Sequence, residues 1–484
     1  MTLAADTAAL LDVAVDELGA HHPELVTARQ RLAEPLRVAI AGKVKAGKST
    51  LLNALVGEQL APTDAGECTR IVTWYRNGHT YRVDAVLADN SRRQLRFDRA
   101  DGAIEVDLGD LTADDIASLD VLWPSSRLAE ITLIDTPGIE SIHADVSQRS
   151  VDFLTGDETT DSADAVLYLM RHAHRDDVRF LESFHDREVA HGTPVNSIGV
   201  LSRADEIGSC RRDAMTSARR IADRYRREPK LRRLCQTVVP VAGLLAQGAA
   251  TLRELEFRQM ATLASQSDES LRLHDVGDFI RDDPRLPITA IEREDLLDRL
   301  GLFGIRVGID VLRRGTATTA DTLARRLFDA SGLPELRQAL LTRFAARADA
   351  LRARSSLAVL ERVLLDAPAA PVGLAAGHER LVAGAHEFAE LRLLNELHLG
   401  MVSFRDDDLD AAEAMLTGAT PQARLGIDDA AGLADVRNAA GDMLDRWRSK
   451  SESPMASQGQ RDASRVIVRS LEGLITAASP PSSD

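Results

Sequence analysis

The octapeptide GKVKAGKS, residues 42–49, constrains the fold of this chain more than any other stretch. It matches the pattern G-x-x-x-x-G-K-[ST], follows the apolar run LRVAIAG (36–42) and opens STLLNALVG (49–57), a predicted helix that ends at Gly57. The glycines let successive N–H groups point at phosphate oxygens, and the helix N-terminus adds a positive partial charge. The stretch therefore predicts a phosphate-binding loop in an α/β domain.

The loop also holds most of the lysine in the chain. Of five lysines, Lys43, Lys45 and Lys48 lie here, whereas arginine is common everywhere else. A compact, flexible ammonium at Lys48 can sit between β- and γ-phosphates, where the planar guanidinium of arginine is too bulky. The Ser49 hydroxyl suits Mg²⁺. The predicted phosphate-loop contacts are Gly42, Lys43, Val44, Lys45, Ala46, Gly47, Lys48, Ser49 and Thr50.

Two further stretches carry groups that a bound nucleoside triphosphate needs. DTPG (135–138) ends a predicted strand, so Asp135 can hold Mg²⁺ through water and the Gly138 N–H can bond the γ-phosphate. Loss of that phosphate would release the segment that follows, as in nucleotide switches. In PTDAGECTR (62–70), Thr69 is preferred to Thr63 as a Mg²⁺ ligand because it lies next to a predicted strand. The predicted metal ligands are therefore Ser49, Thr69 and Asp135.

The stretch LSRAD (201–205) bears on the choice of base. The usual guanine reader is [TN]-K-x-D, whose carboxylate, here Asp205, accepts hydrogen bonds from guanine N1–H and N2–H₂. Adenine lacks this donor pair and would leave a buried carboxylate unpaired. Ser202 and Arg203 depart from the pattern, although arginine can still stack on a base. The alternative is that Asp205 caps a helix. A last base-contacting loop is expected at Ala242 and Gly243.

Strand and helix patterns predict an α/β head followed by an all-α half. Apolar runs alternate with helical stretches up to about residue 245, which is typical of a mostly parallel sheet with helices on both faces. The predicted strands lie within 36–42, 70–78, 81–90, 130–138, 164–170, 196–205 and 237–243. The predicted units are an N-terminal helix (1–35), a nucleotide-binding domain (36–316), a helical region (317–448), a polar linker (449–461), and a final helix with a disordered tail (462–484).

Charge and cysteine content limit the function classes. The net charge is −16, so any contact with nucleic acid or an anionic membrane must be local. Cys68, Cys210 and Cys235 are too few and too scattered for a disulfide framework or a zinc site, which fits a reducing cytoplasm. The N-terminus lacks a basic secretory signal region, and no apolar stretch reaches the roughly 20 residues that a membrane-spanning helix needs. We therefore expect a soluble, cytoplasmic chain.

Four stretches carry a family resemblance. KAGKSTLLNAL, APTDAGECTRIVTW, DTPG and SGLPELRQALLTRFAARADALRARSSL resemble the dynamin superfamily of large GTPases, especially the bacterial dynamin-like proteins and the shorter isoniazid-inducible members of mycobacteria. The similarity weakens beyond about residue 365. It implies that 36–316 is a GTPase head and that an elongated helical neck and trunk follow. It also implies nucleotide contacts at Lys48, Ser49, Thr69, Asp135, Gly138 and Asp205.

Two positions bear on hydrolysis. Lys45 departs from eukaryotic dynamins, where a serine helps to organise the attacking water. Lys45 could place positive charge near the β–γ bridge like an arginine finger, or it could point to solvent or pair with an acid of a neighbouring subunit. Ile139 stands where a water-positioning residue would follow Gly138, so hydrolysis is expected to be slow unless a partner completes the site. Catalytic roles are assigned to Lys45, Lys48, Ser49 and Thr69.

Three amphipathic segments are candidates for the neck. The segments 5–33, roughly 319–350 and 462–478 are each too short to fold alone, and packing them together would bury their apolar stripes. The alternative is that they are unrelated surface helices on the head. The stretch 366–381, with Val372 and Leu374, is a candidate membrane loop, with ordinary packing as the alternative. A partner chain could carry the membrane contact instead.

A basic run occupies 211–233, just after the predicted base-reading loop. It could meet an acidic partner head or RNA, or form a solvated helix face. Tyr225 is its one aromatic residue, which argues against a platform for single-stranded RNA. We therefore expect no nucleic-acid partner.

Together these features predict a dynamin-like GTPase that uses GTP and Mg²⁺, dimerises through its heads, and remodels or maintains the inner face of the plasma membrane. One alternative is a low-turnover GTP-binding scaffold that partners an active paralogue. Another is a cytoplasmic regulatory GTPase of the ribosome-assembly kind. The predicted partners are GTP and GDP, a second copy of the chain, a paralogous dynamin-like chain, and inner-membrane lipids contacted directly or indirectly.

Overall fold

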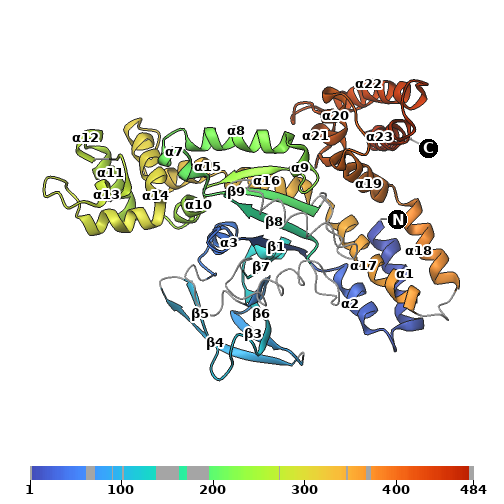
Figure 1. Ribbon diagram of the computed structural model, residues 1–484, viewed down its shortest axis with the longest axis horizontal. Helices are drawn as coiled ribbons and strands as arrows, with labels where there is room; N and C mark the ends of the chain where they lie inside the picture. Colours follow the sequence, from blue (N-terminus) through green and yellow to red (C-terminus); the bar gives the residue numbers. More distant parts are fainter. Residues whose placement is uncertain are drawn as a thin grey trace.

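A ten-stranded mixed sheet forms the centre of the head, and helices extend from it toward both ends of the molecule (Figure 1). The computed structural model describes residues 3–61, 71–89, 91–100, 103–137, 163–171, 196–271, 273–344, 347–366 and 372–478. The strands are β1 (Leu36–Gly42), β2 (Val72–Asn77), β3 (Arg82–Leu87), β4 (Arg92–Ala100), β5 (Ala103–Asp107), β6 (Ile116–Trp123), β7 (Ile131–Asp135), β8 (Ala165–Met170), β9 (Ser197–Ser202) and β10 (Val238–Val241). Their order is β10-β9-β8-β1-β7-β2-β6-β3-β4-β5.

The half of the sheet that carries the phosphate loop is parallel. Strands β10, β9, β8, β1 and β7 run in the same direction, as the sequence predicts. The other half is antiparallel where β2 meets β7, where β3 meets β6 and β4, and where β4 meets β5, while β2 and β6 are parallel. Strands β4, β5 and β6 were not predicted. In the outer strand β4, RRQLRFDRA has no clear apolar run.

Strand β1 explains why the head has a core on each side of the sheet. Every residue of this strand is buried. Val38 and Ile40 belong to one apolar cluster, while Ala39 and Ala41 belong to the other. Side chains alternate between faces along a strand, so a continuous apolar run buries both faces. The prediction of helices on both faces is thus confirmed.

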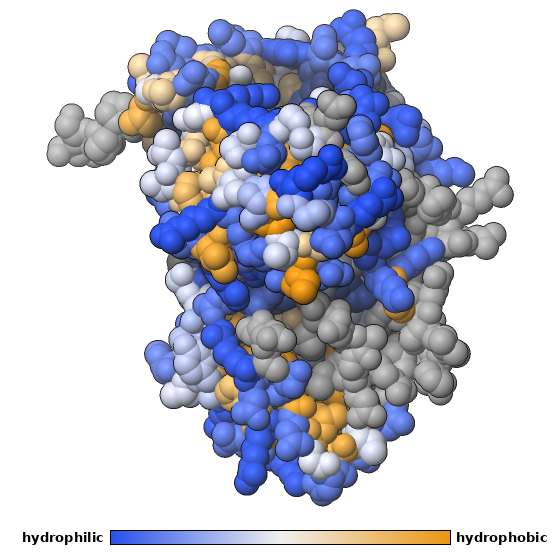
Figure 2. Space-filling view, turned by 90° about the vertical axis from the view of Figure 1, so that its left-hand side faces the viewer, coloured by the Kyte–Doolittle hydropathy of each residue, from blue (hydrophilic) through white to orange (hydrophobic). Residues whose placement is uncertain are grey.

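Helices cover the sheet and extend the head at one end. They are α3 (Lys48–Val56), α4 (Ser126–Glu130), η3 (Ala204–Glu206), α7 (Ile207–Cys210), α8 (Ala214–Arg227), α9 (Pro229–Arg232), α10 (Gly243–Ala250), α11 (Glu254–Ala264), α12 (Asp268–Leu271), α13 (Val276–Ile280), α14 (Ala290–Arg313), α15 (Ala320–Ala330) and α16 (Leu333–Arg343). Helices α11 to α14 form a lobe at the left end of Figure 1. Figure 2 looks onto this end and shows apolar patches separated by hydrophilic side chains, with Leu255, Val276 and Ile291 among the exposed apolar residues.

The remaining helices gather at the opposite end of the molecule (Figure 1). They are α1 (Leu3–Leu18), α2 (Pro23–Arg31), α17 (Ala348–Asp366), α18 (Val372–Gly384), α19 (His386–Leu399), α20 (Asp406–Thr417), α21 (Pro421–Leu425), α22 (Leu433–Glu452) and α23 (Gln458–Ala477). Helices α1 and α2 pack on α17, whereas α23 packs on α22, α19 and α20. The long helical half predicted after the head is therefore confirmed.

Several expectations about these helices need correction. The N-terminal segment is two helices rather than one, because residues 19–22 form a turn at Gly19 and before Pro23. In place of a polar linker over 449–461, α22 continues to Glu452 and α23 begins at Gln458. The segment around 319–350 does not form one neck helix. Its first part, α15, packs on α10 and α14 of the head, and packing against α1 and α2 begins only with α17. Helix α23 joins its sequence neighbours instead of α1 and α2.

The candidate membrane loop is also corrected. Val372 begins helix α18, and Leu374 lies within that helix with 2% of its surface exposed. Leu374 therefore packs in the core of the helical region and is not an inserting side chain. None of the helices in the described ranges is long and apolar enough to cross a bilayer.

A buried ion pair joins the N-terminal helices to the sheet. Arg31 at the end of α2 donates to Asp164, just before β8, with Nη2 and Oδ1 2.6 Å apart. The backbone N–H of Arg37 in β1 donates to the other carboxylate oxygen, at 2.9 Å. Ser355 of α17 also approaches Asp164, at 3.5 Å. The same carboxylate therefore links α2, α17 and the central strands.

Candidate nucleotide-binding site

The phosphate loop connects β1 to α3 at the carboxyl edge of the parallel strands. Lys45 and Gly47 have φ values of 61° and 92°, so the loop curls through left-handed backbone where glycine is favoured. A side chain at Gly42 would also collide with the Leu169 carbonyl oxygen, which lies 2.7 Å from the position of an added Cβ. These constraints explain the two glycines of the motif independently of any ligand.

The Lys48 ammonium lies inside this loop. Its Nζ atom donates to the carbonyl oxygens of Gly42 at 3.2 Å and Lys43 at 3.4 Å. Burial lowers the pKa of Lys48, and the nearby Asp135 carboxylate acts in the opposite direction. The structure therefore keeps a poorly solvated cation at the start of α3, where a phosphate would replace carbonyl oxygens as the acceptor. Lys45 is exposed, which agrees with either role considered for it.

Ser49 and Asp135 meet beside the loop. The Ser49 hydroxyl donates to Asp135 Oδ2 at 3.2 Å. Asp135 Oδ1 is buried and has no hydrogen-bond partner within the part of the chain that the structure describes. Burial raises the pKa of Asp135 to about 6, although Lys48 and Ser49 oppose the shift. An orphaned oxygen beside a hydroxyl fits a hard divalent cation, since Mg²⁺ prefers oxygen ligands.

The predicted base-reading residues lie at the end of β9, across a cavity of about 200 Å³ from the phosphate loop. Ala46, Gly47, Thr50, Ser202, Arg203, Asp205 and Gly243 line this cavity. Ala242 is the residue before α10, and its N–H donates to the Ser331 carbonyl. The structure thus brings together three stretches that are far apart in the sequence. Carboxyl ends of parallel strands are where α/β sheets bind nucleotides.

Asp205 is 8% exposed, and burial raises its pKa to about 6. It lies within η3, and the residues at the N-cap positions of η3, α7 and α8 are Arg203, Glu206 and Asp213. The alternative that Asp205 is a helix cap is therefore not supported. Arg203 has a left-handed φ of 51° and pairs with Glu206, with Nη1 and Oε1 2.9 Å apart. Its Nη2 also donates to the Lys45 carbonyl at 3.4 Å, which ties the base-reading stretch to the phosphate loop.

Sequence reasoning missed two residues of α14, one that lies near Asp205 and one that holds the loop after it. Gly301 interrupts this helix with a φ of 68°, and a Cβ built there would lie 3.6 Å from Asp205 Oδ2. Arg306, 8% exposed, donates to the carbonyl oxygens of Ser209, Cys210, Leu273 and His274. Ser209 and Cys210 both have left-handed backbone, which is strained for residues other than glycine. No short motif could reveal this support, because Arg306 lies about a hundred residues after the loop it holds.

Two predicted site residues lie outside the described residues. These are Thr69, predicted to bind Mg²⁺, and Gly138, predicted to contact the γ-phosphate, together with Ile139 that follows it. The remaining phosphate-loop residue, Val44, is exposed.

The sheet order, the loop from β1 to α3 and the Asp135 carboxylate define a P-loop nucleotide-binding protein. The family model described as "Dynamin family" matches residues 38–203. The isoniazid-induced protein IniC of Mycobacterium tuberculosis is 40% identical over 451 residues, which cover 92% of this chain and 91% of that protein. The chain belongs to the dynamin family, and its head is a dynamin-family GTPase domain.

Two other relatives are more distant in sequence. A bacterial dynamin-like protein of Nostoc punctiforme is 29% identical over 146 residues, which cover 28% of this chain and 20% of that protein. A solved chain from an oligomerised bacterial dynamin pair, described as sensing and tethering membranes at long range, aligns with 98% of this chain and 79% of its own length. Its sequence identity is 13% and its TM-score is 0.31.

Proposed function

We propose that this chain binds GTP with Mg²⁺, hydrolyses it slowly as an isolated subunit, and couples head-to-head dimerisation to remodelling or maintenance of the inner face of the plasma membrane. The observation that carries the proposal is the placement of Lys48, Asp135 and Asp205 around the carboxyl edge of one sheet. Membership in the dynamin family and the long helical half support the membrane role.

The residues of the chain divide the work of binding. The curled phosphate loop and the N-terminus of α3 direct N–H groups at phosphate, and the Lys48 ammonium offsets negative charge there. Asp205 accepts from the guanine edge, so an adenine base would leave a poorly solvated carboxylate unpaired. Ser49 and Asp135 would hold Mg²⁺, together with Thr69 as predicted from the sequence. The ion would neutralise charge that develops on phosphate oxygens.

Slow turnover follows from the sequence around the γ-phosphate, where Ile139 replaces a water-positioning side chain. A second head, from another copy or from a paralogue, would then complete the site. In this proposal Lys45 is the loop residue that supplies positive charge for catalysis, since its side chain is exposed and can reach either the nucleotide or the partner.

The test is GTP turnover per subunit across a protein titration, with and without anionic liposomes. Turnover that rises with protein concentration or with liposomes supports heads that complete each other. Flat, near-zero turnover with intact GTP binding identifies a scaffold or switch. Sedimentation with RNA in place of liposomes identifies a regulatory GTPase. The Lys48→Ala variant is the control for nucleotide dependence, because it removes the ammonium of the phosphate loop.

A further inference from the structure

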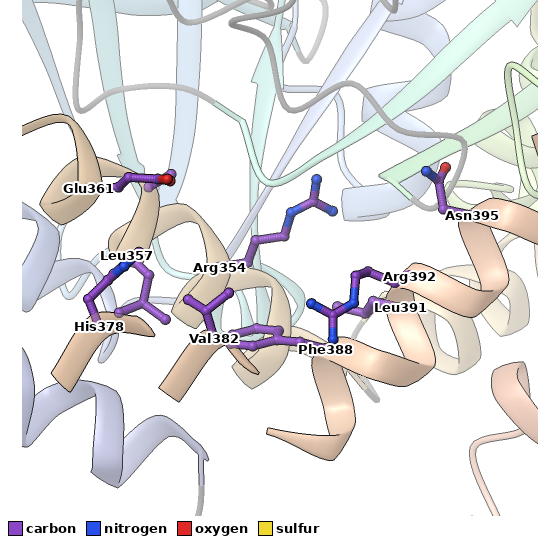
Figure 3. Close-up of a pocket in the computed structure, with 10 residues that line it drawn as sticks. Arg354, Leu357, Glu361, His378, Val382, Phe388, Leu391, Arg392 and Asn395 are labelled. Atoms are coloured by element: carbon purple, nitrogen blue, oxygen red, sulfur yellow. The ribbon is translucent and has the colours of Figure 1, made fainter. Parts of the chain in front are cut away.

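A cavity of about 270 Å³ lies in the helical region, away from the nucleotide site. It is formed by α17, α18 and α19, whose lining side chains Figure 3 shows as sticks. Its volume is close to the lower end of the range for small-molecule pockets. Neither the head nor its nucleotide chemistry accounts for it.

The lining of this cavity combines apolar side chains with several polar and charged ones. Leu357, Val382, Phe388 and Leu391 line the apolar part. In Figure 3, His378 and Glu361 lie toward one end and Asn395 toward the other, with Arg354 and Arg392 between them. Such a lining suits a molecule with an apolar body and one polar group.

Two buried polar atoms of the lining have unmet hydrogen-bonding capacity. His378 is 8% exposed, and its Nε2 atom has no hydrogen-bond partner within the described ranges. The same holds for Asn395 Oδ1. A buried polar atom without a partner costs about 1–3 kcal/mol. Ordered water can donate to Asn395 Oδ1, whereas an ionised carboxylate has no donor to offer it, and His378 Nε2 can pair with water or with a polar group of a ligand.

The two arginines of the lining favour an anion. Burial lowers the pKa of the Arg354 guanidinium, so this cation is poorly solvated. Arg392 lies on the neighbouring helix at the exposed margin of the cavity. Glu361 is the only carboxylate among the lining residues, and it is exposed at the end that holds His378. A guanidinium binds carboxylate and phosphate oxygens with two parallel hydrogen bonds.

We propose that this cavity binds an anionic amphiphile, with its carboxylate or phosphate at Arg354 and Arg392 and its methylene chain against Leu357, Val382, Phe388 and Leu391. The ligand is either a free single-chain acid or one chain of an anionic membrane lipid. The site is independent of the GTPase proposal, since no lining residue takes part in nucleotide binding.

Calorimetric titration of the full chain with monomeric hexanoate, octanoate and decanoate tests the site. Affinity is expected to rise about fourfold for each methylene added, which corresponds to about 0.8 kcal/mol, until the cavity is full. The alkanol of the same chain length is expected to bind at least about tenfold more weakly, because it lacks the charge that pairs with guanidinium. Thermal melting with decanoate gives a second readout, as a ligand of the folded state raises the Tm.

Variants locate the binding. Arg354→Gln and, separately, Arg392→Gln are expected to weaken the binding of decanoate about tenfold and to leave the affinity for decanol unchanged. Leu357→Trp is expected to weaken both by filling the apolar part. Arg362→Gln, an exposed arginine on the same helix outside the lining, is the matched control and should change nothing.

Vesicles separate the two sources of ligand. The ligand is a membrane lipid if the protein sediments with phosphatidylglycerol vesicles, if Arg354→Gln abolishes this sedimentation, and if added decanoate prevents it. Decanoate binding without such sedimentation assigns a free acid. The proposal is overturned if decanoate does not bind, if decanol binds as tightly, or if Leu357→Trp binds decanoate like the unmodified chain.

Discussion

Replacing Asp205 by asparagine should change the base preference of this protein. Asp205 lies in the cavity that the phosphate loop and the base-reading stretch share, and only 8% of its surface is exposed. Its two carboxylate oxygens can accept both guanine donors. The asparagine amide keeps one acceptor and turns the other position into a donor, which faces the guanine N2–H₂ group. Xanthine carries an acceptor at that position, so Asp205→Asn should favour xanthine nucleotides.

The size of the effect follows from the burial of Asp205. A hydrogen bond to a charged group contributes about 1.5–3 kcal/mol, and two are at stake here. Losing one and creating a donor–donor contact should cost about 3 kcal/mol, which is roughly a hundredfold in Kd. Little of this should be recovered by water, because the carboxylate is poorly solvated already. Exposed Asp213, eight residues further along the chain, is the matched control, and Asp213→Asn should leave both affinities unchanged.

The pKa of Asp205 gives the same experiment a pH signature. Burial raises this pKa to about 6, and only the ionised carboxylate accepts from both guanine donors. GTP affinity should therefore be constant above about pH 7 and weaken as the pH falls through 6. In Asp205→Asn, the part of this dependence that belongs to residue 205 should vanish, while the contribution of Asp135 remains.

Competition of a fluorescent GDP analogue by GTP, ATP and XTP, from pH 5 to 8, measures both effects. Equal base preference in Asp205→Asn and the unmodified chain would refute the assignment of Asp205 as the guanine reader. A hundredfold loss of GTP affinity without any gain in XTP affinity would show instead that the substitution disturbs the loop.

Three further predictions concern the loop, the metal and the helical region. Lys45→Ala should slow single-turnover GTP hydrolysis by on the order of a thousandfold if Lys45 acts like an arginine finger, and an unchanged rate would exclude that role. Ser49→Ala should raise the Mg²⁺ concentration needed for half-maximal GTP binding, which a magnesium titration of the same competition assay detects; identical titration curves would contradict Ser49 as a ligand. Asp164→Ala should lower the free energy of unfolding by about 3–5 kcal/mol in denaturant titrations, because Arg31 is left buried without its carboxylate. Asp12→Ala, which removes an exposed ion pair with an arginine, should lower the free energy of unfolding by less than about 1 kcal/mol. Equal losses of stability in the Asp164 and Asp12 variants would contradict a stabilising role for the buried pair.

The head could be predicted in outline because its signals are local. The phosphate loop, the buried run before it and the helix ending at Gly57 all lie within about twenty residues, and the structure shows the C-cap of α3 at Gly57 with left-handed backbone. Strands β7, β8, β9 and β10 were each readable because both of their faces are buried. The outer strand β4 was not, because a partly solvated strand with arginine at several positions lacks that signature, and β5 is a five-residue strand, AIEVD, with two acidic residues.

The helical half was predictable in kind but not in arrangement. Helical periodicity shows that a helix has an apolar stripe, but several stripes of similar width compete for the same partners. Helix α23 packs on α22, which precedes it by a short turn, although its sequence would equally allow packing on α1. Leu374 illustrates the same limit, since an apolar residue just after an interruption of the helical pattern can be exposed or buried, and here it is buried within α18.

By itself, the sequence determined that the chain contains a phosphate loop on an α/β sheet, that DTPG and LSRAD end strands of that sheet, and that a long helical half follows. These conclusions depend on residues close together in the chain, whose spacing reports local backbone geometry. Only the tertiary structure decided that Arg306 holds the turn at Ser209 and Cys210, that Asp164 joins α2 to the sheet, and that three helices enclose a cavity lined by two arginines. The reason is that each of these contacts joins residues far apart in sequence, and burial of the whole assembly selects among pairings that local patterns leave equivalent.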